Sequence, residues 1–154
     1  MQENYRNICK IARTTAGLTQ ERWAEVIDVS VESVRLYESG KNMPSDDVVL
    51  RMAEVSGHRL ICYWHLLNKS RVAADLLPEV SDTPLPQAVL QLICRMRRFG
   101  EKHLADRLME IAEDGRVDEL EKEQFDQILE ELGEIIQAAM TVKFAKGDKD
   151  EDFS

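Results

Sequence analysis

The sequence predicts an all-α protein, and three observations support this. Apolar residues recur at intervals of three and four through both halves of the 154-residue chain. Ser and Thr precede several of these segments, as N-caps do, and glycines follow others, as C-caps do. Three prolines between positions 78 and 86 separate the halves. We expect a first domain over 1–76, a proline-rich linker over 77–86, a helical domain over 87–146 and a flexible acidic tail over 147–154.

Residues 19–45 predict two short helices joined by a tight turn. Thr19 can cap the first helix and Ser30 the second. Asp28 lies at the corner, and Asp accepts the left-handed conformation better than most residues. Gly40 supplies a left-handed stop after the second helix. The inward positions share helical spacing, and they are Trp23, Ala24, Ile27, Val34 and Tyr37. This layout is a helix-turn-helix.

Several short motifs in this region agree in register with a known family. They are Leu18-Thr19-Gln20-Glu21, Ala24-Glu25, Val29-Ser30, Glu38 with Gly40-Lys41, and Pro44-Ser45. From about Tyr5 to Leu67 the chain resembles the repressor/Cro (Xre) family of helix-turn-helix DNA-binding domains. The resemblance implies a five-helix domain and an ion pair between Arg13 and Glu38. The implied helix starts are Thr19, Ser30 and Ser45, and the last helix would carry Trp64 and Leu67.

In such a domain the second helix of the motif lies in the major groove of DNA. Helical spacing and the resemblance point to Val31, Glu32, Arg35 and Leu36 as base-contacting residues. Arg35 can hold guanine with two hydrogen bonds, Glu32 can accept from the cytosine amino group, and Val31 can pack on a thymine methyl. The expected phosphate contacts are Gln20, Ser30, Lys41 and Asn42. The sequence therefore predicts a DNA-binding transcriptional regulator, a repressor of bacterial or phage type.

Val31 and Leu36 leave a second interpretation open. Phage members of the family often carry glutamine or arginine at these two positions. Two apolar side chains on this face can read methyl groups, or they can form a patch that binds another protein. The alternative function is therefore a protein-interaction module on the same fold, like an antitoxin or an antirepressor.

Charge is distributed unevenly along the chain. The net charge is −9, yet residues 1–70 hold nine basic and nine acidic residues, so residues 71–154 carry the whole excess. The acidic half is not expected to touch DNA. A neutral first domain offers few phosphate contacts, so one copy would bind weakly. We therefore expect the protein to act on double-stranded DNA as a homodimer.

The second half shows three amphipathic helices. The apolar stripes are Leu85, Val89, Leu92, Ile93, Met96 and Phe99; Leu104, Leu108 and Ile111; and Phe125, Ile128, Leu129, Leu132, Ile135, Ile136 and Met140. We expect these helices to dimerise or to bind another protein; alternatively, the stripes satisfy one another within one chain. A basic cluster, Arg95, Arg97, Arg98 and Lys102, is expected to neutralise the acidic stretch 119–134 across a helix pair.

Other function classes find little support in the sequence. No nucleophile motif, phosphate loop or metal-ligand cluster is present, so we expect neither an enzyme nor a cofactor or metal site. Residues 114–121 match the second half of a calcium-binding loop, but Ala112 cannot ligate, and we interpret the segment as Asp118 and Glu121 capping a helix. The cysteines Cys9, Cys62 and Cys94 are expected to be reduced core residues. No apolar stretch could cross a membrane or serve as a signal peptide, and a cytoplasmic location is expected.

Overall fold

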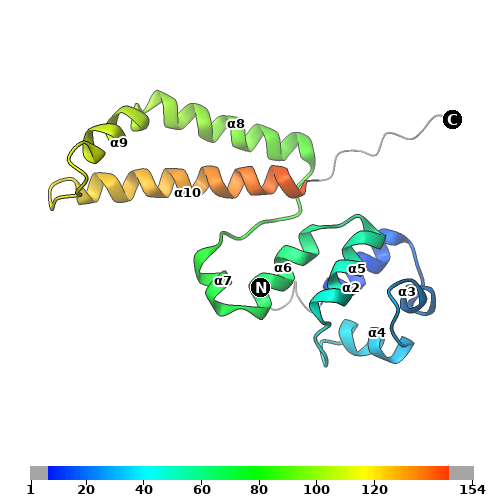
Figure 1. The fold of residues 1–154 in the computed structure, drawn as a ribbon. Helices are drawn as coiled ribbons and strands as arrows, with labels where there is room; N and C mark the ends of the chain where they lie inside the picture. Colours follow the sequence, from blue (N-terminus) through cyan, green and yellow to red (C-terminus); the bar gives the residue numbers. More distant parts are fainter. Residues whose placement is uncertain (1–6, 146–154) are drawn as a thin grey trace. The chain divides into compact units, whose positions relative to one another are not determined.

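A computed structural model describes residues 7–145, and within this range all regular structure is helical (Figure 1). The chain divides into two compact units after Leu77. The predicted all-α fold is therefore confirmed. Within the described residues, none of the helices combines the length and the apolar character that a membrane span needs.

The first unit contains the five expected helices and one short addition. In chain order they are α2 (Ile8–Ala16), α3 (Gln20–Val26), α4 (Val31–Glu38), α5 (Asp46–Ser56), α6 (Leu60–Lys69) and α7 (Arg71–Leu76). Thr19, Ser30 and Ser45 are the N-caps of α3, α4 and α5, and each accepts a hydrogen bond from a backbone N–H three residues on. These local polar bonds set the three predicted helix starts.

The core of the first unit lies beneath the helix-turn-helix. Trp23, Ala24, Ile27 and Val34 are buried there against Val49, Met52 and Ile61, which α5 and α6 supply. Tyr37 is only partly buried at the edge of this cluster. Trp64 is also half-buried, and its ring centroid lies 5.9 Å from that of His58. The motif is thus fixed to the rest of the unit by apolar packing.

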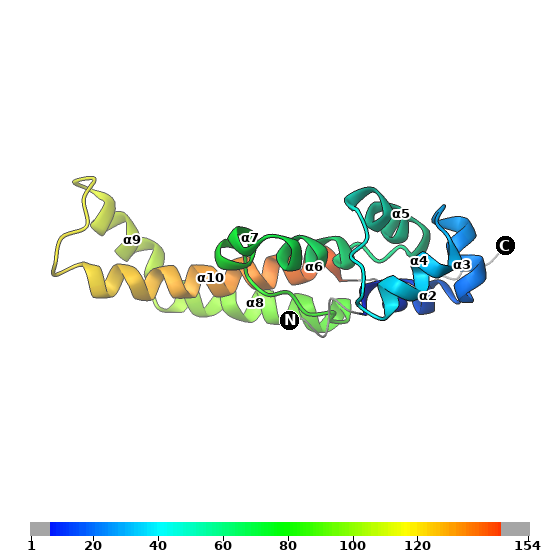
Figure 2. The same cartoon turned by 90° about the horizontal axis from the view of Figure 1, so that it is seen from below.

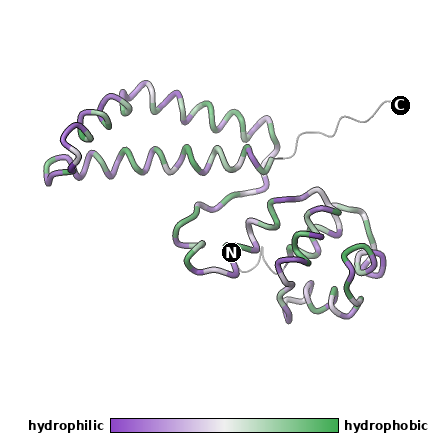
Figure 3. Tube along the Cα trace, in the orientation of Figure 1, coloured by the Kyte–Doolittle hydropathy of each residue, from purple (hydrophilic) through white to green (hydrophobic). Residues whose placement is uncertain are grey.

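The second unit is a helical hairpin with a short helix at its bend. It consists of α8 (Leu85–Glu101), α9 (Leu104–Ala112) and α10 (Lys122–Phe144), which confirms the three predicted helices. Figures 1 and 2 show α8 and α10 side by side in both views. Hydrophobic and hydrophilic residues alternate along both helices (Figure 3). Each therefore has an apolar side to pack.

The segment expected to be a linker, residues 77–86, is not a free connection in the structure. Helix α8 begins at Leu85, two residues before position 87, with Pro86 in its first turn, where proline is well tolerated. Val80 is buried, and the Gln137 side-chain amide donates to the Glu79 carbonyl at 2.8 Å. Glu79 and Val80 are therefore held within the second unit, which begins at Pro78. The predicted acidic tail, 147–154, lies outside the described residues.

The loop between α9 and α10 is held by its own side chains. Glu121 Oε2 accepts from the Asp118 N–H at 3.1 Å, and Asp118 Oδ1 accepts from the Glu121 N–H at 2.9 Å. The reciprocal bonds are those predicted for Asp118 and Glu121, but they close a turn ahead of α10, which begins at Lys122 with Glu121 as its N-cap. Gly115, with φ 73°, turns the chain just before it.

One expectation about the cysteines is wrong. Cys9 is buried and Cys62 is half-buried, but Cys94 is exposed. Cys94 lies two residues after the half-buried Leu92, which turns its side chain about 200° around α8 and away from the packed side.

Candidate nucleic-acid interface

The two helices of the motif meet at a turn whose geometry the sequence dictates. Thr19 Oγ1 accepts from the Arg22 N–H at 3.2 Å, and Ser30 Oγ accepts from the Ser33 N–H at 3.0 Å. Between the two caps, Asp28 adopts φ 56°, the left-handed conformation that Asp tolerates. Ala24 of α3 is buried in the core cluster, and α3 and α4 pack against each other. The motif is therefore set by local hydrogen bonds and one left-handed residue.

A contact from α5 closes the end of α3. Arg51 Nε donates to the Ile27 carbonyl at 2.8 Å. The last carbonyls of a helix lack partners within it, so this bond satisfies one of them. Sequence reasoning missed Arg51, because the two residues are 24 positions apart and nothing in the local pattern signals the bond.

Polar side chains from α2, α3 and α4 meet around Glu38. Arg13 Nε lies 2.6 Å from Glu38 Oε1 and Arg13 Nη2 lies 3.3 Å from Glu38 Oε2. Arg13 Nη1 also donates to the Leu18 carbonyl at 3.0 Å. The hydrogen bond with Glu38 raises the pKa of Arg13 above its ordinary value. Arg13 and Glu38 therefore join α2 to the end of α4, as the family resemblance implies.

Gln20, an expected phosphate contact, also belongs to this cluster. Its side-chain amide donates to Glu38 Oε2 at 2.8 Å. One amide hydrogen is thereby used, and the second remains as a donor, because an amide nitrogen carries two. Gln20 stands at the first position of α3, so its orientation is fixed by the same carboxylate that holds Arg13.

The outward side of α4 carries Glu32 and Arg35, which are both exposed. Arg35 Nη1 lies 3.7 Å from Glu32 Oε2, one helical turn away. At this separation and exposure the pair is weak and easily exchanged. The two side chains expected to contact bases are therefore both accessible in the free protein.

Val31 and Leu36, the other two expected base contacts, are half-buried. Val31 packs against the core cluster of the first unit. Only part of each side chain is thus left for a partner, and the apolar area on this face is smaller than the sequence suggests.

The remaining expected phosphate contacts frame α4 at its two ends. Ser30 Oγ lies 2.8 Å from Ser33 Oγ in addition to capping the helix. After the helix, the backbone N–H groups of Lys41 and Asn42 both donate to the Leu36 carbonyl, at 3.0 and 3.2 Å. This fixes the loop while both side chains stay exposed. Donors therefore lie at both ends of the helix.

Comparison with known proteins identifies the motif. Residues 10–57 match the model of the helix-turn-helix family, which confirms the Xre/Cro-type resemblance for this segment. The family is one of DNA-binding regulatory domains. No curated protein and no solved structure matches the chain significantly.

Proposed function

Because residues 10–57 form a DNA-binding helix-turn-helix domain, we propose that this protein is a sequence-specific transcriptional repressor of bacterial or phage type. Helix α4 carries the proposal. Its start is capped by Ser30, Val34 is buried beneath it, and Glu32 and Arg35 are exposed on its outer side. These features support α4 as the helix that enters the major groove.

Base recognition would depend on an exchange of partners by Arg35. In the free protein its guanidinium lies 3.7 Å from Glu32 Oε2. On DNA, the guanidinium would donate two hydrogen bonds to guanine O6 and N7, and Glu32 would accept from a cytosine amino group. Val31 and Leu36 would add apolar contacts to thymine methyls. The free pair is weak enough for the bases to replace it.

Phosphate contacts would set the position of α4 along the groove. Gln20, Ser30, Lys41 and Asn42 are the donors available around it. One copy has few such contacts, so we propose that two copies act together and place two copies of α4 about 34 Å apart on a palindromic site. Occupancy of that site in the cytoplasm would block transcription, and the protein itself would catalyse nothing.

The test is selection from a randomised double-stranded DNA library with the full chain at physiological salt. We expect enrichment of one palindromic motif with half-sites about one helical turn apart. The Arg35→Ala variant provides the matched control, because it removes a base contact and leaves the buried side of α4 unchanged. It should enrich a motif that is degenerate at one position in each half-site.

Failure of a correctly folded protein to enrich any sequence would overturn this proposal. That outcome would favour the alternative, a protein-interaction module, for which Val31 and Leu36 are the candidate contacts. The partial burial of both side chains favours DNA over this alternative, because it leaves little apolar area for a protein partner.

A further inference from the structure

The contact between α8 and α10 uses one side of each helix. Along this contact, buried and half-buried residues recur every three or four positions on both helices, whereas Gln137, Met140 and Thr141 are covered on other sides of α10. On α8 this inner row is Leu85, Ala88, Leu92, Arg95 and Phe99, and on α10 it is Ile128, Glu131, Ile135, Ala138 and Val142. Such spacing places one row per helix along the contact between them.

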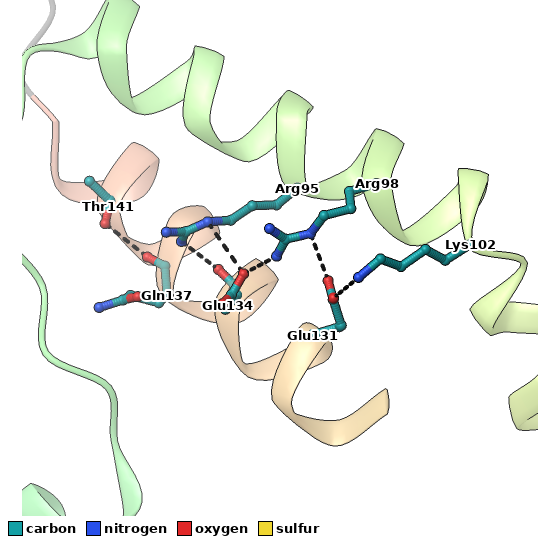
Figure 4. A network of polar contacts seen from close by, with 7 residues as sticks. All are labelled: Arg95, Arg98, Lys102, Glu131, Glu134, Gln137 and Thr141. Atoms are coloured by element: carbon teal, nitrogen blue, oxygen red, sulfur yellow. Dashed lines mark hydrogen bonds and ion pairs between the residues drawn. The ribbon is translucent and has the colours of Figure 1, made fainter. Parts of the chain in front are cut away.

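Ion pairs show which sides of the two helices lie together. Arg98 reaches from α8 to Glu131 and Glu134 on α10, and Lys102 Nζ lies 2.5 Å from Glu131 Oε1 (Figure 4). Arg95 Nη1 donates to the Glu134 carbonyl at 2.8 Å. Later residues of α8 thus meet earlier residues of α10, and the helices are antiparallel. Three of the four residues of the basic cluster thus make the expected neutralising contacts, and Arg97 is exposed instead.

The ion pair between Arg98 and Glu134 also shows which positions lie on each flank of the hairpin. Arg98 stands one residue before Phe99 of the inner row, and Glu134 stands one residue before Ile135. Positions just before the inner row therefore share one flank. Positions just after it must share the other, because each residue turns about 100° around a helix.

That other flank is apolar on both helices. On α8 it carries Val89, Ile93 and Met96, and on α10 it carries Leu129 and Ile136. The exposed fraction of Met96 is 52% and that of Ile136 is 53%. The hairpin thus has one flank of ion pairs and one flank of exposed, aligned apolar side chains. We call the second the apolar flank.

We propose that a second copy of this chain docks on the apolar flank, so that two hairpins form a four-helix bundle. This deepens the proposed function, which requires two copies on one DNA site. Helices of 17 and 23 residues present a footprint of roughly 600 Å² at ~1.5 Å rise and ~10 Å width. Side chains raise the accessible area above this footprint, toward the ~800 Å² per partner of a stable interface.

The net charges of the two helices favour one arrangement of the two copies. Helix α8 contains three arginines and one glutamate, whereas α10 contains five carboxylates and two lysines. Arg97 on α8 and Asp126 on α10 are exposed and stand outside the ion-pair cluster. They lie four residues after Ile93 and three before Leu129, so each neighbours a residue of the apolar flank on its helix surface. A two-fold axis that lays α8 across the partner's α10 brings opposite charges together, while α8 on α8 would bring like charges together.

A glycine in the middle of α10 supports a close approach. Gly133 lies four residues after Leu129 and three before Ile136, and a Cβ added there would meet no atom within 4 Å. Glycine weakens a helix interior, and no atom of the described residues lies close enough to require it at this position. A helix of the second copy that packs against α10 would occupy the open space beside Gly133.

The test is sedimentation velocity on the full chain without DNA, over a wide concentration range. We expect a species of twice 17.7 kDa. The double variant Ile93→Gln/Ile136→Gln should raise the dimer dissociation constant by at least about a hundredfold, since it removes apolar burial twice in each copy. Arg97→Glu should also weaken the dimer. Leu120→Gln is the control, because Leu120 is 92% exposed but lies in the loop before α10.

A wild-type protein that stays monomeric at every concentration would overturn the proposal. So would a dimer that the double variant weakens no more than Leu120→Gln does. A tighter dimer for Arg97→Glu would overturn the arrangement of α8 across α10. Far-UV circular dichroism checks that the variants keep their helices. The selection from the DNA library measures DNA binding independently of sedimentation. The proposed function and the proposed dimer can therefore be refuted separately.

Discussion

Arg13 Nε lies 2.6 Å from Glu38 Oε1, and this ion pair ties α2 to the last residue of the helix that carries the candidate base contacts. The two side chains are only 16% and 9% exposed. Ions at this depth are stable only as a pair, because neither is fully hydrated. The orientation of α4 therefore depends on a residue outside the helix-turn-helix.

Replacing Arg13 by alanine should destabilise the first unit. Among the described residues, Glu38 would keep only the Gln20 amide as a side-chain donor, and we expect the free energy of unfolding to fall by about 2 kcal/mol. Urea denaturation measures this change. The control is Glu25→Ala, which breaks the exposed pair with Arg22 and should cost less than about 0.5 kcal/mol. Equal losses of unfolding free energy in the two variants would show that the buried Arg13–Glu38 pair stabilises the unit no more than the exposed pair does.

Asp28, at φ 56°, offers a stabilising substitution. Glycine adopts this conformation without strain, so Asp28→Gly should raise the free energy of unfolding by about 0.5–1 kcal/mol. Asp28→Val should lower it by about 1 kcal/mol or more, since a β-branched side chain clashes there. Denaturant unfolding of both variants checks the signs. A destabilising glycine would mean that the Asp28 side chain supports the turn in some other way.

Helix starts could be predicted because capping is a local interaction. Thr19, Ser30 and Ser45 each bond a backbone N–H three residues on, and the sequence shows both partners. The inward side of α3 and α4 followed from helical spacing for the same reason. The core residues Trp23 and Val34 are as buried as predicted.

Contacts between residues far apart in the chain could not be predicted from one sequence. The bond from Arg51 to the Ile27 carbonyl and that from Gln20 to Glu38 join separate elements, and no spacing rule relates them. Spacing also could not show that Val31 is half-buried, because that depends on how the neighbouring elements pack. For Cys94, residue type suggested burial, but its position around α8 decides its exposure.

Arg35 and Lys41 should affect DNA binding in different ways. Arg35→Ala should cost about 1–3 kcal/mol on the preferred site and relax the preference at one base position. Lys41→Ala should weaken binding to all sequences alike and reduce the slope of log K against log salt by about one per copy. Binding titrations on matched and mismatched sites at several salt concentrations distinguish the two. If Arg35→Ala weakens all sites equally, Arg35 contacts phosphate and not a base.

The cysteines should differ sharply in reactivity. Burial raises the pKa of the Cys9 thiol to about 11, while Cys94 is exposed. Since the thiolate is the reactive form, a maleimide at neutral pH should modify Cys94 at least about a hundredfold faster than Cys9. Mass spectrometry of the peptides over time measures both rates. The Cys94→Ser variant should lose the fast phase of maleimide modification. Fast modification of Cys9 would contradict the prediction and would mean that the first unit opens readily.

Glu131 should make the second unit sensitive to acid. Hydrogen bonds from Lys102 and Arg98 lower the pKa of Glu131 below its ordinary value of 4.5. A carboxyl whose pKa is lower in the folded than in the unfolded state binds fewer protons when folded. Its stabilisation is thus complete above about pH 4.5 and is lost as the pH falls through the lowered value.

Thermal unfolding from about pH 6 to about pH 3 tests this dependence. Glu131→Gln should lower the melting temperature at the upper end of the range and change little at the lower end, where the wild-type carboxyl is itself protonated. The two curves should therefore converge as the pH falls. Glu123→Gln is the matched control, because Glu123 is an exposed carboxylate in the first turn of the same helix. A constant gap between wild type and Glu131→Gln at every pH would show that Glu131 acts through packing and not through its charge.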